Sequence, residues 1–315
     1  MQKRGKTAAG TQRWYCPTCQ KSATRIRTDT RLRHRRALFN RWSTGVVSRT
    51  VLAREYAVNN RTLTRWLIPI AQESIQLSVP DTHANEIILC DGLHINGRYG
   101  VLLLIRTIAN PVACIEVPWE SSSTWTTAFS AVEEPSVIVG DGQKGMIRAI
   151  RMKWPHVRFQ RCLVHVHRLC MIRISQHPTT KAGQELYTLV SFLFSVWTRR
   201  QKRRWIRAFH RWQKRYESVI NEKLVIIYPS GRKGWRYSHG RLHAARSLLR
   251  NALPDMFTYV GHWEIPRTTN YCEGGLNAPI KELLHRHRGA TVSMKKAIVL
   301  RYLLKRVKKP PRNVL

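Results

Sequence analysis

The sequence predicts a mixed α/β fold with an α-helical insertion, preceded by two small basic segments. Between Glu86 and Arg161, short apolar stretches alternate with Gly and Pro turns, as expected for consecutive β-strands. Residues 180–250 are instead rich in Trp, Arg, Leu and Phe at helical spacing. A chain of 315 residues is long enough for one large domain with one or two small ones.

The first segment, residues 1–35, is basic and contains the pair Cys16 and Cys19. Two thiolates at C-x-x-C spacing can bind one face of a tetrahedral Zn²⁺, so the segment is expected to be a partial zinc ribbon. A structural zinc site takes four ligands, and no second pair lies nearby in the sequence. A surface turn with two free thiols is the alternative.

Residues 36–80 are expected to form a helix-turn-helix. Apolar residues recur at helical spacing from Ala37 to about Leu77, and Val58-Asn59-Asn60 interrupts them. Two helices are therefore predicted, with Asn60 as the N-cap of the second. The exposed face of this second helix is expected to contact DNA through Arg61, Thr64 and Arg65. An ordinary helical hairpin with a solvated basic face would have the same pattern.

The next segment, residues 85–178, is expected to hold the strands of the sheet. Strands are predicted at residues 87–91, 99–106, 112–117, 137–141 and 157–161. Helices are predicted at residues 123–131 and 143–153 and from Val164 onward. This order of strands and helices is that of an RNase H-like mixed sheet.

Two further segments complete the chain. Residues 179–262 are expected to be a helical insertion that presents a basic surface to a phosphate backbone, with most of its Trp rings in the core. Residues 263–315 are expected to return to the core as helices and contain Pro-Arg-Thr-Thr-Asn-Tyr-Cys-Glu-Gly-Gly at residues 266–275. The tail of this segment is a basic amphipathic helix that ends at prolines.

Charge is the strongest compositional signal. The chain has 55 Lys and Arg against 18 Asp and Glu, a formal net charge of +37, which predicts a polyanionic partner, and nucleic acid is the commonest. No apolar stretch approaches the length of a membrane span, and the first residues lack a signal peptide. Seven scattered cysteines fit a reducing compartment, and Cys90, Cys114 and Cys170 are expected to be buried and inert. A cytoplasmic, nucleoid-associated protein is expected.

Acidic residues are scarce, so their positions are informative. Asp91 and Asp141 each end an apolar strand, where side chains of a sheet can converge. Each is followed by Gly, which is expected to leave room for a substrate or a metal beside the backbone. Carboxylates suit Mg²⁺ or Mn²⁺, and a pair of such ions can stabilise phosphodiester cleavage. Glu273 is the best third candidate, ahead of Glu264 and Glu282. A structural salt bridge to Arg is the alternative for each acid.

These residues lie in motifs that resemble the mutator-like DDE transposases of bacterial insertion sequences. The motifs are DGLHI at 91–95, VGDGQKG at 139–145, CLVH at 162–165, PRTTNYCEGG at 266–275 and LLHRHRG at 283–289. The resemblance implies an RNase H-like core, a helical insertion before the Glu, and catalytic, metal-binding roles for Asp91, Asp141 and Glu273. It also implies that Cys162 and His165 form a signature pair, for which we expect a supporting role.

The resemblance further implies a transposase that binds the ends of an insertion sequence, cuts them and joins them to target DNA. A homo-oligomer is expected because two DNA ends must be paired. Phosphate contacts are expected from Lys281, Arg286 and Arg288, although a solvated helix face would look the same. Relatives with a complete ribbon have two Cys pairs, whereas this chain has one.

Two other functions use the same features. A DNA-binding regulator, or a transposase remnant without activity, needs the basic surface but no acid cluster. An RNase H-like repair nuclease would share the chemistry and differ in substrate. Whether Asp91, Asp141 and Glu273 come together in space separates catalysis from binding alone.

Overall fold

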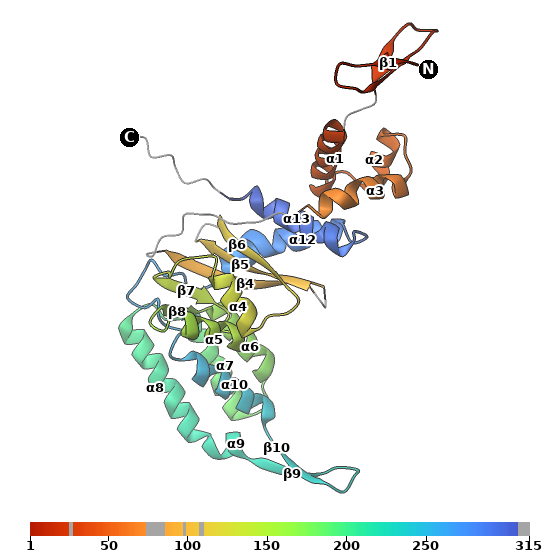
Figure 1. Cartoon of the computed structure of the whole chain (residues 1–315). Helices are drawn as coiled ribbons and strands as arrows, with labels where there is room; N and C mark the ends of the chain where they lie inside the picture. Colours follow the sequence, from red (N-terminus) through yellow and green to blue (C-terminus); the bar gives the residue numbers. More distant parts are fainter. Residues whose placement is uncertain (25–27, 74–85, 97–98, 107–109, 308–315) are drawn as a thin grey trace, which may run out of the picture. The chain divides into compact units, whose positions relative to one another are not determined.

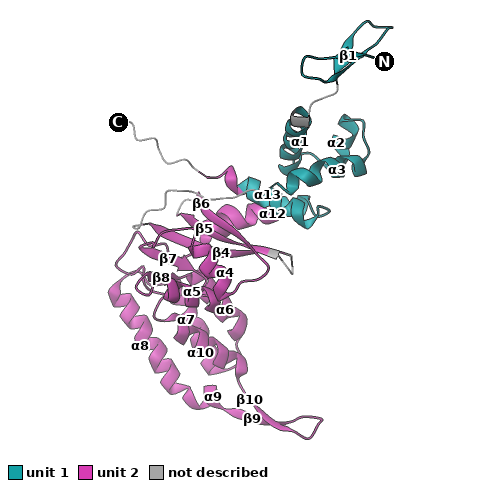
Figure 2. Ribbon diagram, viewed as in Figure 1, with its two compact units in different colours: residues 1–75, 282–302 teal, residues 76–281, 303–315 magenta. Residues whose placement is uncertain are grey.

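The computed structural model describes residues 1–24, 28–73, 86–96, 99–106 and 110–307. These residues belong to two compact units, coloured separately in Figure 2. Unit 1 contains Met1–Ile75 and Glu282–Tyr302, and unit 2 contains Gln76–Lys281 and Leu303–Leu315. The five expected domain boundaries stay predictions, and residues 74–80 and 308–315 of the expected domains lie outside the described residues.

Unit 1 begins with a three-stranded antiparallel sheet made of β1 (Gln2–Lys6), β2 (Gln12–Tyr15) and β3 (Ser22–Thr24). Three helices follow: α1 (Thr28–Ser43), α2 (Arg49–Glu55) and α3 (Asn60–Ala71). Two later helices, α12 (Ala278–Arg286) and α13 (Val292–Leu304), contribute their residues 282–286 and 292–302 to this unit. Apolar side chains from α1, α2, α3 and α13 form one buried cluster that includes Phe39, Trp42, Leu63, Leu67 and Met294.

The helices of unit 1 differ from the prediction in two ways. Three helices rather than two cover residues 37–73, because Thr44–Gly45 ends α1 before α2 begins, with Gly45 at a φ of +74°. The N-cap of α3 is Asn59 rather than Asn60, since the Asn59 side chain accepts a hydrogen bond from the Thr62 N–H at 2.7 Å.

Unit 2 is built on a five-stranded sheet with the order β6-β5-β4-β7-β8 (Figure 1). The strands are β4 (Ile87–Asn96), β5 (Tyr99–Arg106), β6 (Asn110–Val117), β7 (Val137–Gly140) and β8 (Arg158–Arg161). The first three strands pair antiparallel, whereas β4 with β7 and β7 with β8 pair parallel. The prediction of a mixed α/β fold is confirmed.

The sheet separates two faces of side chains. On one face, Ile88, Leu102 and Ile138 pack against α4 (Ser122–Phe129) and α5 (Lys144–Lys153), forming a core with Trp125 and Met146. The opposite face of β4 is contacted by the short helix α11 (Asn270–Cys272). Because side chains alternate along a strand, a residue two positions beyond a paired residue lies on the same face of the sheet as that paired residue.

This register brings two predicted acids to one face. Leu89 of β4 pairs with Val139 of β7, so Asp91 and Asp141, two residues further along each chain, point to the same side. Asp91 lies within β4 rather than at its end, because β4 continues to Asn96 in its antiparallel pairing with β5. Asp141 directly follows β7, which ends at Gly140, one residue earlier than predicted.

The remaining helices of unit 2 are α6 (Leu163–Ile174), α7 (Lys181–Ser191), α8 (Arg199–Arg215), α9 (Glu217–Asn221) and α10 (Gly240–Ala252), with a 3-10 turn at Phe192–Ser195. The expected helical insertion also contains a two-stranded hairpin of β9 (Lys223–Ile227) and β10 (Lys233–Tyr237), which the sequence did not predict. Of the four Trp residues of this segment, Trp205 and Trp212 are buried, whereas Trp197 and Trp235 are exposed, so the prediction that most of these rings lie in the core is wrong. Across the described residues, no helix combines the length and apolarity needed to span a bilayer.

We expect Asn59→Ala to weaken α3, because it leaves the Thr62 N–H without its capping partner at a cost of about 1 kcal/mol. Hydrogen exchange of the α3 amides, followed by mass spectrometry, should show several-fold faster exchange than in the wild type. Asn60→Ala is the matched control and should change exchange little. Equal effects from the two substitutions would contradict the cap at Asn59.

Candidate active site

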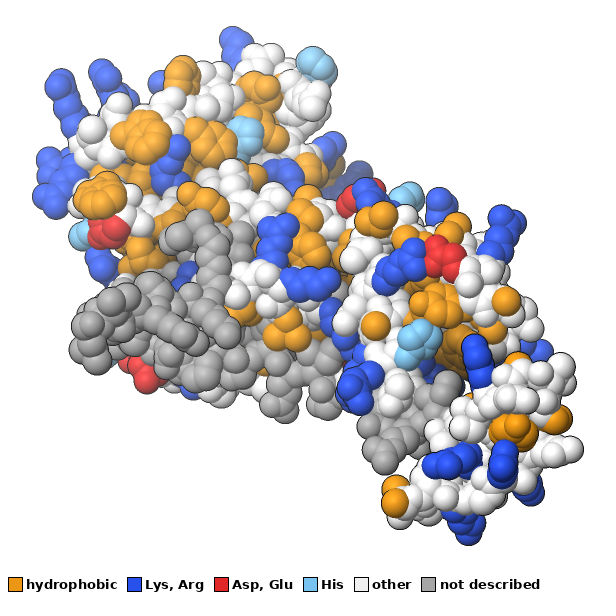
Figure 3. Space-filling view, turned by 90° about the horizontal axis from the view of Figure 1, so that it is seen from above, with side chains coloured by type: hydrophobic (Ala, Val, Ile, Leu, Met, Phe, Trp, Pro, Cys, Tyr) orange, Lys and Arg blue, Asp and Glu red, His pale blue; other side chains and the backbone are white. Residues whose placement is uncertain are grey.

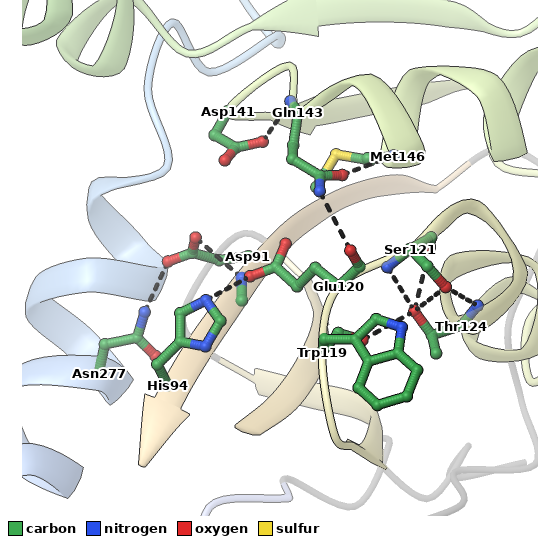
Figure 4. A network of polar contacts seen from close by, with 11 residues as sticks. Asp91, His94, Trp119, Glu120, Ser121, Thr124, Asp141, Gln143, Met146 and Asn277 are labelled. Carbon is green, nitrogen blue, oxygen red and sulfur yellow. Dashed lines mark hydrogen bonds and ion pairs between the residues drawn. The ribbon is translucent and has the colours of Figure 1, made fainter. Parts of the chain in front are cut away.

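A hydrogen bond joins the first predicted acid to the C-terminal part of unit 2. Asn277 Nδ2 donates to Asp91 Oδ2 at 2.5 Å, and the Gly92 N–H donates to Asp91 Oδ1 at 3.0 Å (Figure 4). Asp91 is 7% exposed. Burial, together with the charges of Asp141 and Glu273, raises the pKa of Asp91 to about 7 against the lowering effect of His165. The protonation of Asp91 therefore depends on the charges of both other predicted acids.

Glu273 reaches this place from an irregular turn of helix. Residues Glu273–Asn277 form a π-helical turn between α11 and α12, and such turns are frequent at functional sites. Glu273 and Asn277 lie at the two ends of this turn, and both act on Asp91. Glu273 Oε1 is buried and accepts no hydrogen bond, although His165 Nε2 lies 3.4 Å away.

The signature pair Cys162 and His165 supports this helical segment. Both the N–H and the hydroxyl of buried Thr269 donate to Cys162 Sγ at 3.3 Å, one residue before α11 begins. His165 approaches Glu273 from α6. Burial lowers the pKa of His165, but Cys162, Glu273 and Asp91 outweigh it and raise the pKa to about 8. The geometry fits the supporting role expected from the sequence.

A fourth carboxylate, Glu120, lies beside the predicted acids and was missed by sequence reasoning. It follows β6 and precedes the Ser121 N-cap of α4, and its Oε1 lies 3.1 Å from His94 Nε2 (Figure 4). Burial raises the pKa of Glu120, and the charge of Asp141 raises it further. Glu120 belongs to none of the quoted motifs, so only the scarcity of acids could have drawn attention to it.

The two glycines after the aspartates make room for side chains of the protein itself. A Cβ on Gly92 would lie 1.9 Å from Glu120 Oε1, and a Cβ on Gly142 would lie 2.2 Å from Arg161 Nε. Gly142 also has a φ of +79°, a conformation that disfavours other residues. The sequence prediction that these glycines leave space for substrate or metal is therefore wrong for the space next to their Cα atoms.

The four carboxylates differ in their partners from several other acids of the described residues. Elsewhere Arg neutralises acids, as in Arg41–Glu55, Arg106–Glu86 and Arg215–Glu185. Within the described parts of the chain, no Lys or Arg forms an ion pair with Asp91, Glu120, Asp141 or Glu273. The Arg161 guanidinium lies near Asp141, but it donates to the Gly142 carbonyl at 3.1 Å. The salt-bridge alternative is thus not the one adopted here.

The arrangement of donor atoms in this cluster bears on metal binding by the protein. No three His, Cys, Asp or Glu side chains of the described residues are close enough together to surround one ion. The donor chemistry nevertheless suits a divalent cation, because carboxylate oxygens without Lys or Arg partners lie near one another. Glu273 Oε1 and Asn277 Oδ1 are buried without hydrogen bonds, and either oxygen can act as a ligand. Binding of Mg²⁺ or Mn²⁺ by these residues stays a prediction.

Other predicted residues lie away from this cluster. Glu264 pairs with His262 at 3.3 Å, and Glu282 pairs with Arg286 at 3.1 Å on α12, so neither competes with Glu273 as the third acid. Lys281 and Arg288 are exposed. On α3, Arg61 and Arg65 are exposed, and Thr64 donates to the Asn60 carbonyl at 2.8 Å. DNA contacts by these residues stay predictions.

The two N-terminal cysteines lie between β2 and β3. Hydrogen bonds with Cys19 and Thr18 lower the pKa of Cys16 to about 7, which favours the thiolate form that binds zinc. Around them, the described residues provide no further ligand that completes a tetrahedral set. Zinc binding by Cys16 and Cys19 stays a prediction. Cys90, Cys114 and Cys170 are buried, as predicted.

Basic side chains dominate the surface. Figure 3 shows Lys and Arg side chains spread over the visible face, with few acidic side chains among them. Phosphate contacts by such a surface add up over many residues and depend strongly on salt.

Residues 112–224 match the family model described as "Transposase, Mutator family". The matched residues include Glu120, Asp141, Cys162 and His165, whereas Asp91 and Glu273 lie outside them. No curated protein matches the chain.

We expect the stability of the metal-free protein to fall as pH rises from about 4 to about 7. Asp91 has a pKa near 7 in the folded protein and an ordinary value of 3.8 when unfolded, so ionisation in this range favours the unfolded chain. The raised pKa corresponds to at most about 4 kcal/mol. His165, with a pKa of about 8, loses stabilisation in the same direction between about pH 6.5 and 8.

Asp91→Asn should therefore raise the urea midpoint at pH 8 and leave it nearly unchanged at pH 4. Glu134→Gln, at an exposed position, removes the same charge and should shift neither midpoint. A wild-type midpoint that is equal at pH 4 and pH 8 would contradict the raised pKa of Asp91.

Proposed function

We propose that this chain, a mutator-like transposase by the match of residues 112–224, cuts DNA at the ends of an insertion sequence and joins those ends to target DNA. Asp91, Asp141 and Glu273 are proposed as the catalytic acids of a DDE mechanism. Glu120 is proposed as a fourth carboxylate of the same site.

One observation carries this proposal. In a chain with 55 basic and 18 acidic residues, neighbouring acids that share no Arg or Lys partner are unexpected, yet Asp91 lies near Asp141 and Glu273, and none of the three forms an ion pair with Arg or Lys among the described residues. Instead, the charges of Asp141 and Glu273 act on Asp91 and help to raise its pKa. Grouping like charges without neutralising them is costly, and a cation bound in function would offset that cost.

Asp91, Asp141 and Glu273 would hold Mg²⁺ or Mn²⁺, which, when bound, stabilises charge on the attacking and leaving oxygens at phosphorus. The protein residues around them orient these acids. Asn277 fixes one oxygen of Asp91 through its amide, and the Gln143 N–H donates to Asp141 Oδ1 at 2.8 Å. Cys162 holds Thr269 at the start of the helical segment that carries Glu273.

The fold agrees with this assignment. Three antiparallel strands followed by two parallel ones, in the order β6-β5-β4-β7-β8, are what an RNase H-like core requires. Helices α2 and α3 are joined by a short turn, and exposed Arg61 and Arg65 on α3 suit a helix-turn-helix that reads DNA. The ends of the element and its target are the proposed DNA partners, held by an oligomer that pairs two ends.

A chain that binds DNA without cutting it is the alternative. It draws support from the absence, among the described side chains, of three ligands already arranged around one point. If the protein cuts DNA, removal of a single carboxylate should reduce cleavage and leave DNA binding intact. If it only binds DNA, the same removal should affect neither.

We expect Asp91→Asn, Asp141→Asn and Glu273→Gln each to reduce Mn²⁺-dependent nicking of DNA by at least about 100-fold, because each removes a proposed ligand. DNA binding, measured by fluorescence anisotropy without divalent cation, should stay within about two-fold of the wild type. Nicking products are mapped on denaturing gels with labelled candidate end sequences.

Glu264→Gln is the matched control for Glu273→Gln, since Glu264 is an exposed acid paired with His262. It should leave nicking unchanged. Nicking that persists in all three acid variants would refute the catalytic assignment, and a wild type that binds but never nicks would favour the binding-only alternative.

We also expect Mn²⁺ to raise the melting temperature of the wild type at pH 8. A ligand at 100 times its dissociation constant stabilises the folded state by about 2.7 kcal/mol. Asp91→Asn and Glu273→Gln should lose most of this shift, whereas Glu134→Gln should keep it. The same shift in every variant would place the cation elsewhere.

A further inference from the structure

A groove of about 870 Å³ opens beside Asp141 in unit 2. Helices α5, α6 and α10 form its walls, and Arg161 and His165 line the end next to the acids. Nothing in the proposed chemistry at the carboxylates requires a space of this size. Its volume lies toward the upper end of the range of about 300–1,000 Å³ found for pockets that bury organic ligands.

Each wall presents one stripe of side chains to the groove. Lys144 and Arg148 lie four residues apart on α5, and Ser247 and Asn251 lie four residues apart on α10. On α6 the stripe is His165, Leu169 and Arg173. Residues at this spacing share one face of a helix, so the groove follows α6 for about two turns, roughly 12 Å, away from Glu273.

The groove is lined mainly by positive charge, and several of its basic groups have no partner among the described residues. Lys144 and Arg148 are exposed and have no hydrogen bond or ion pair within the described structure. Arg161 is 8% exposed, and its Nε is buried without a hydrogen-bond partner. Arg173 donates to the Ala244 carbonyl at 3.1 Å. Asp141 is the single acid of the lining, so the groove complements a polyanion.

The lining also has apolar and polar uncharged parts. Ile147, Leu169 and Leu248 provide apolar surface, and Ser247 and Asn251 provide hydrogen-bonding groups. A duplex offers a protein mostly its phosphates and the edges of its grooves, whereas an unpaired strand also exposes whole bases and sugars. The mixture of basic, apolar and amide side chains therefore suits an unpaired strand better than a duplex.

We infer that this groove binds an unpaired segment of DNA that continues from the phosphodiester held at the acids. The inference rests on the proposed function. Lys144 and Arg148 contact phosphates of this segment, Arg161 binds the phosphate nearest to Asp141, and Asn251 lies where a base edge can pair with its amide. The groove then binds DNA whose two strands have separated near the cleaved phosphodiester in preference to an intact duplex.

Photo-crosslinking of the full chain to a short single-stranded oligonucleotide containing 4-thiothymidine, without divalent cation, tests this inference. Mass spectrometry should find the crosslinks in the peptides of α5, α6 and α10. Lys144→Ala combined with Arg148→Ala should reduce the yield of these crosslinks by at least 10-fold. The double substitution should also reduce the slope of log K for binding against log salt concentration by about 1.4 in magnitude. A duplex of the same sequence should crosslink there at least 10-fold less.

The matched control is Arg203→Ala combined with Arg207→Ala, two exposed bases four residues apart on α8. It removes the same charge and should leave the groove crosslinks within about two-fold of the wild type. An equal loss in both double variants, crosslinks elsewhere, or equal crosslinking of the duplex overturns the inference. Groove crosslinks without any nicking would support strand binding in the groove and reject the proposed catalysis. Nicking without groove crosslinks would support the proposed catalysis and reject strand binding in the groove.

Discussion

The contact between Asn277 and Asp91 is the constraint on which the rest of the candidate site depends. It joins a strand of the sheet to a helical turn 186 residues further along the chain. Through it, the helical segment that carries Glu273 is held against β4, the strand that carries Asp91. Without this packing, the two residues would be unrelated acids in a basic protein.

The electrostatic consequence is a place where carboxylates lie near one another without Lys or Arg partners. Burial and the neighbouring acids raise the pKa of Asp91, and Glu120 is affected in the same direction. His165, whose pKa is lowered by burial but raised more strongly by Cys162, Glu273 and Asp91, provides part of the compensation. The basic residues nearest to the site, such as Arg161 and Lys144, face the adjoining groove instead. Negative and positive charge are thus separated over a short distance, as a site that binds both a cation and a polyanion requires.

Elements with a strong local pattern were predicted closely. The strand at residues 99–106 was predicted with its observed bounds, and the strand after Ser136 differs by one residue, because each is a continuous apolar stretch bounded by turns. The hairpin of β9 and β10 was missed, since several of its apolar residues, including Val225 and Trp235, are exposed, so no burial pattern marks the strands. The extent of β4 beyond Asp91 was missed for a different reason: it depends on pairing with β5.

The sequence by itself determined the mixed α/β class, the basic character, the motifs and the three candidate acids, because spacing and composition are local properties of the chain. Only the tertiary structure decided that Glu120 joins those acids, that Glu120 and Arg161 fill the space beside the two glycines, and that a basic groove begins at Asp141. These features arise from strand register and helix packing between residues far apart in sequence. Such contacts depend on distances in space, which no local pattern encodes.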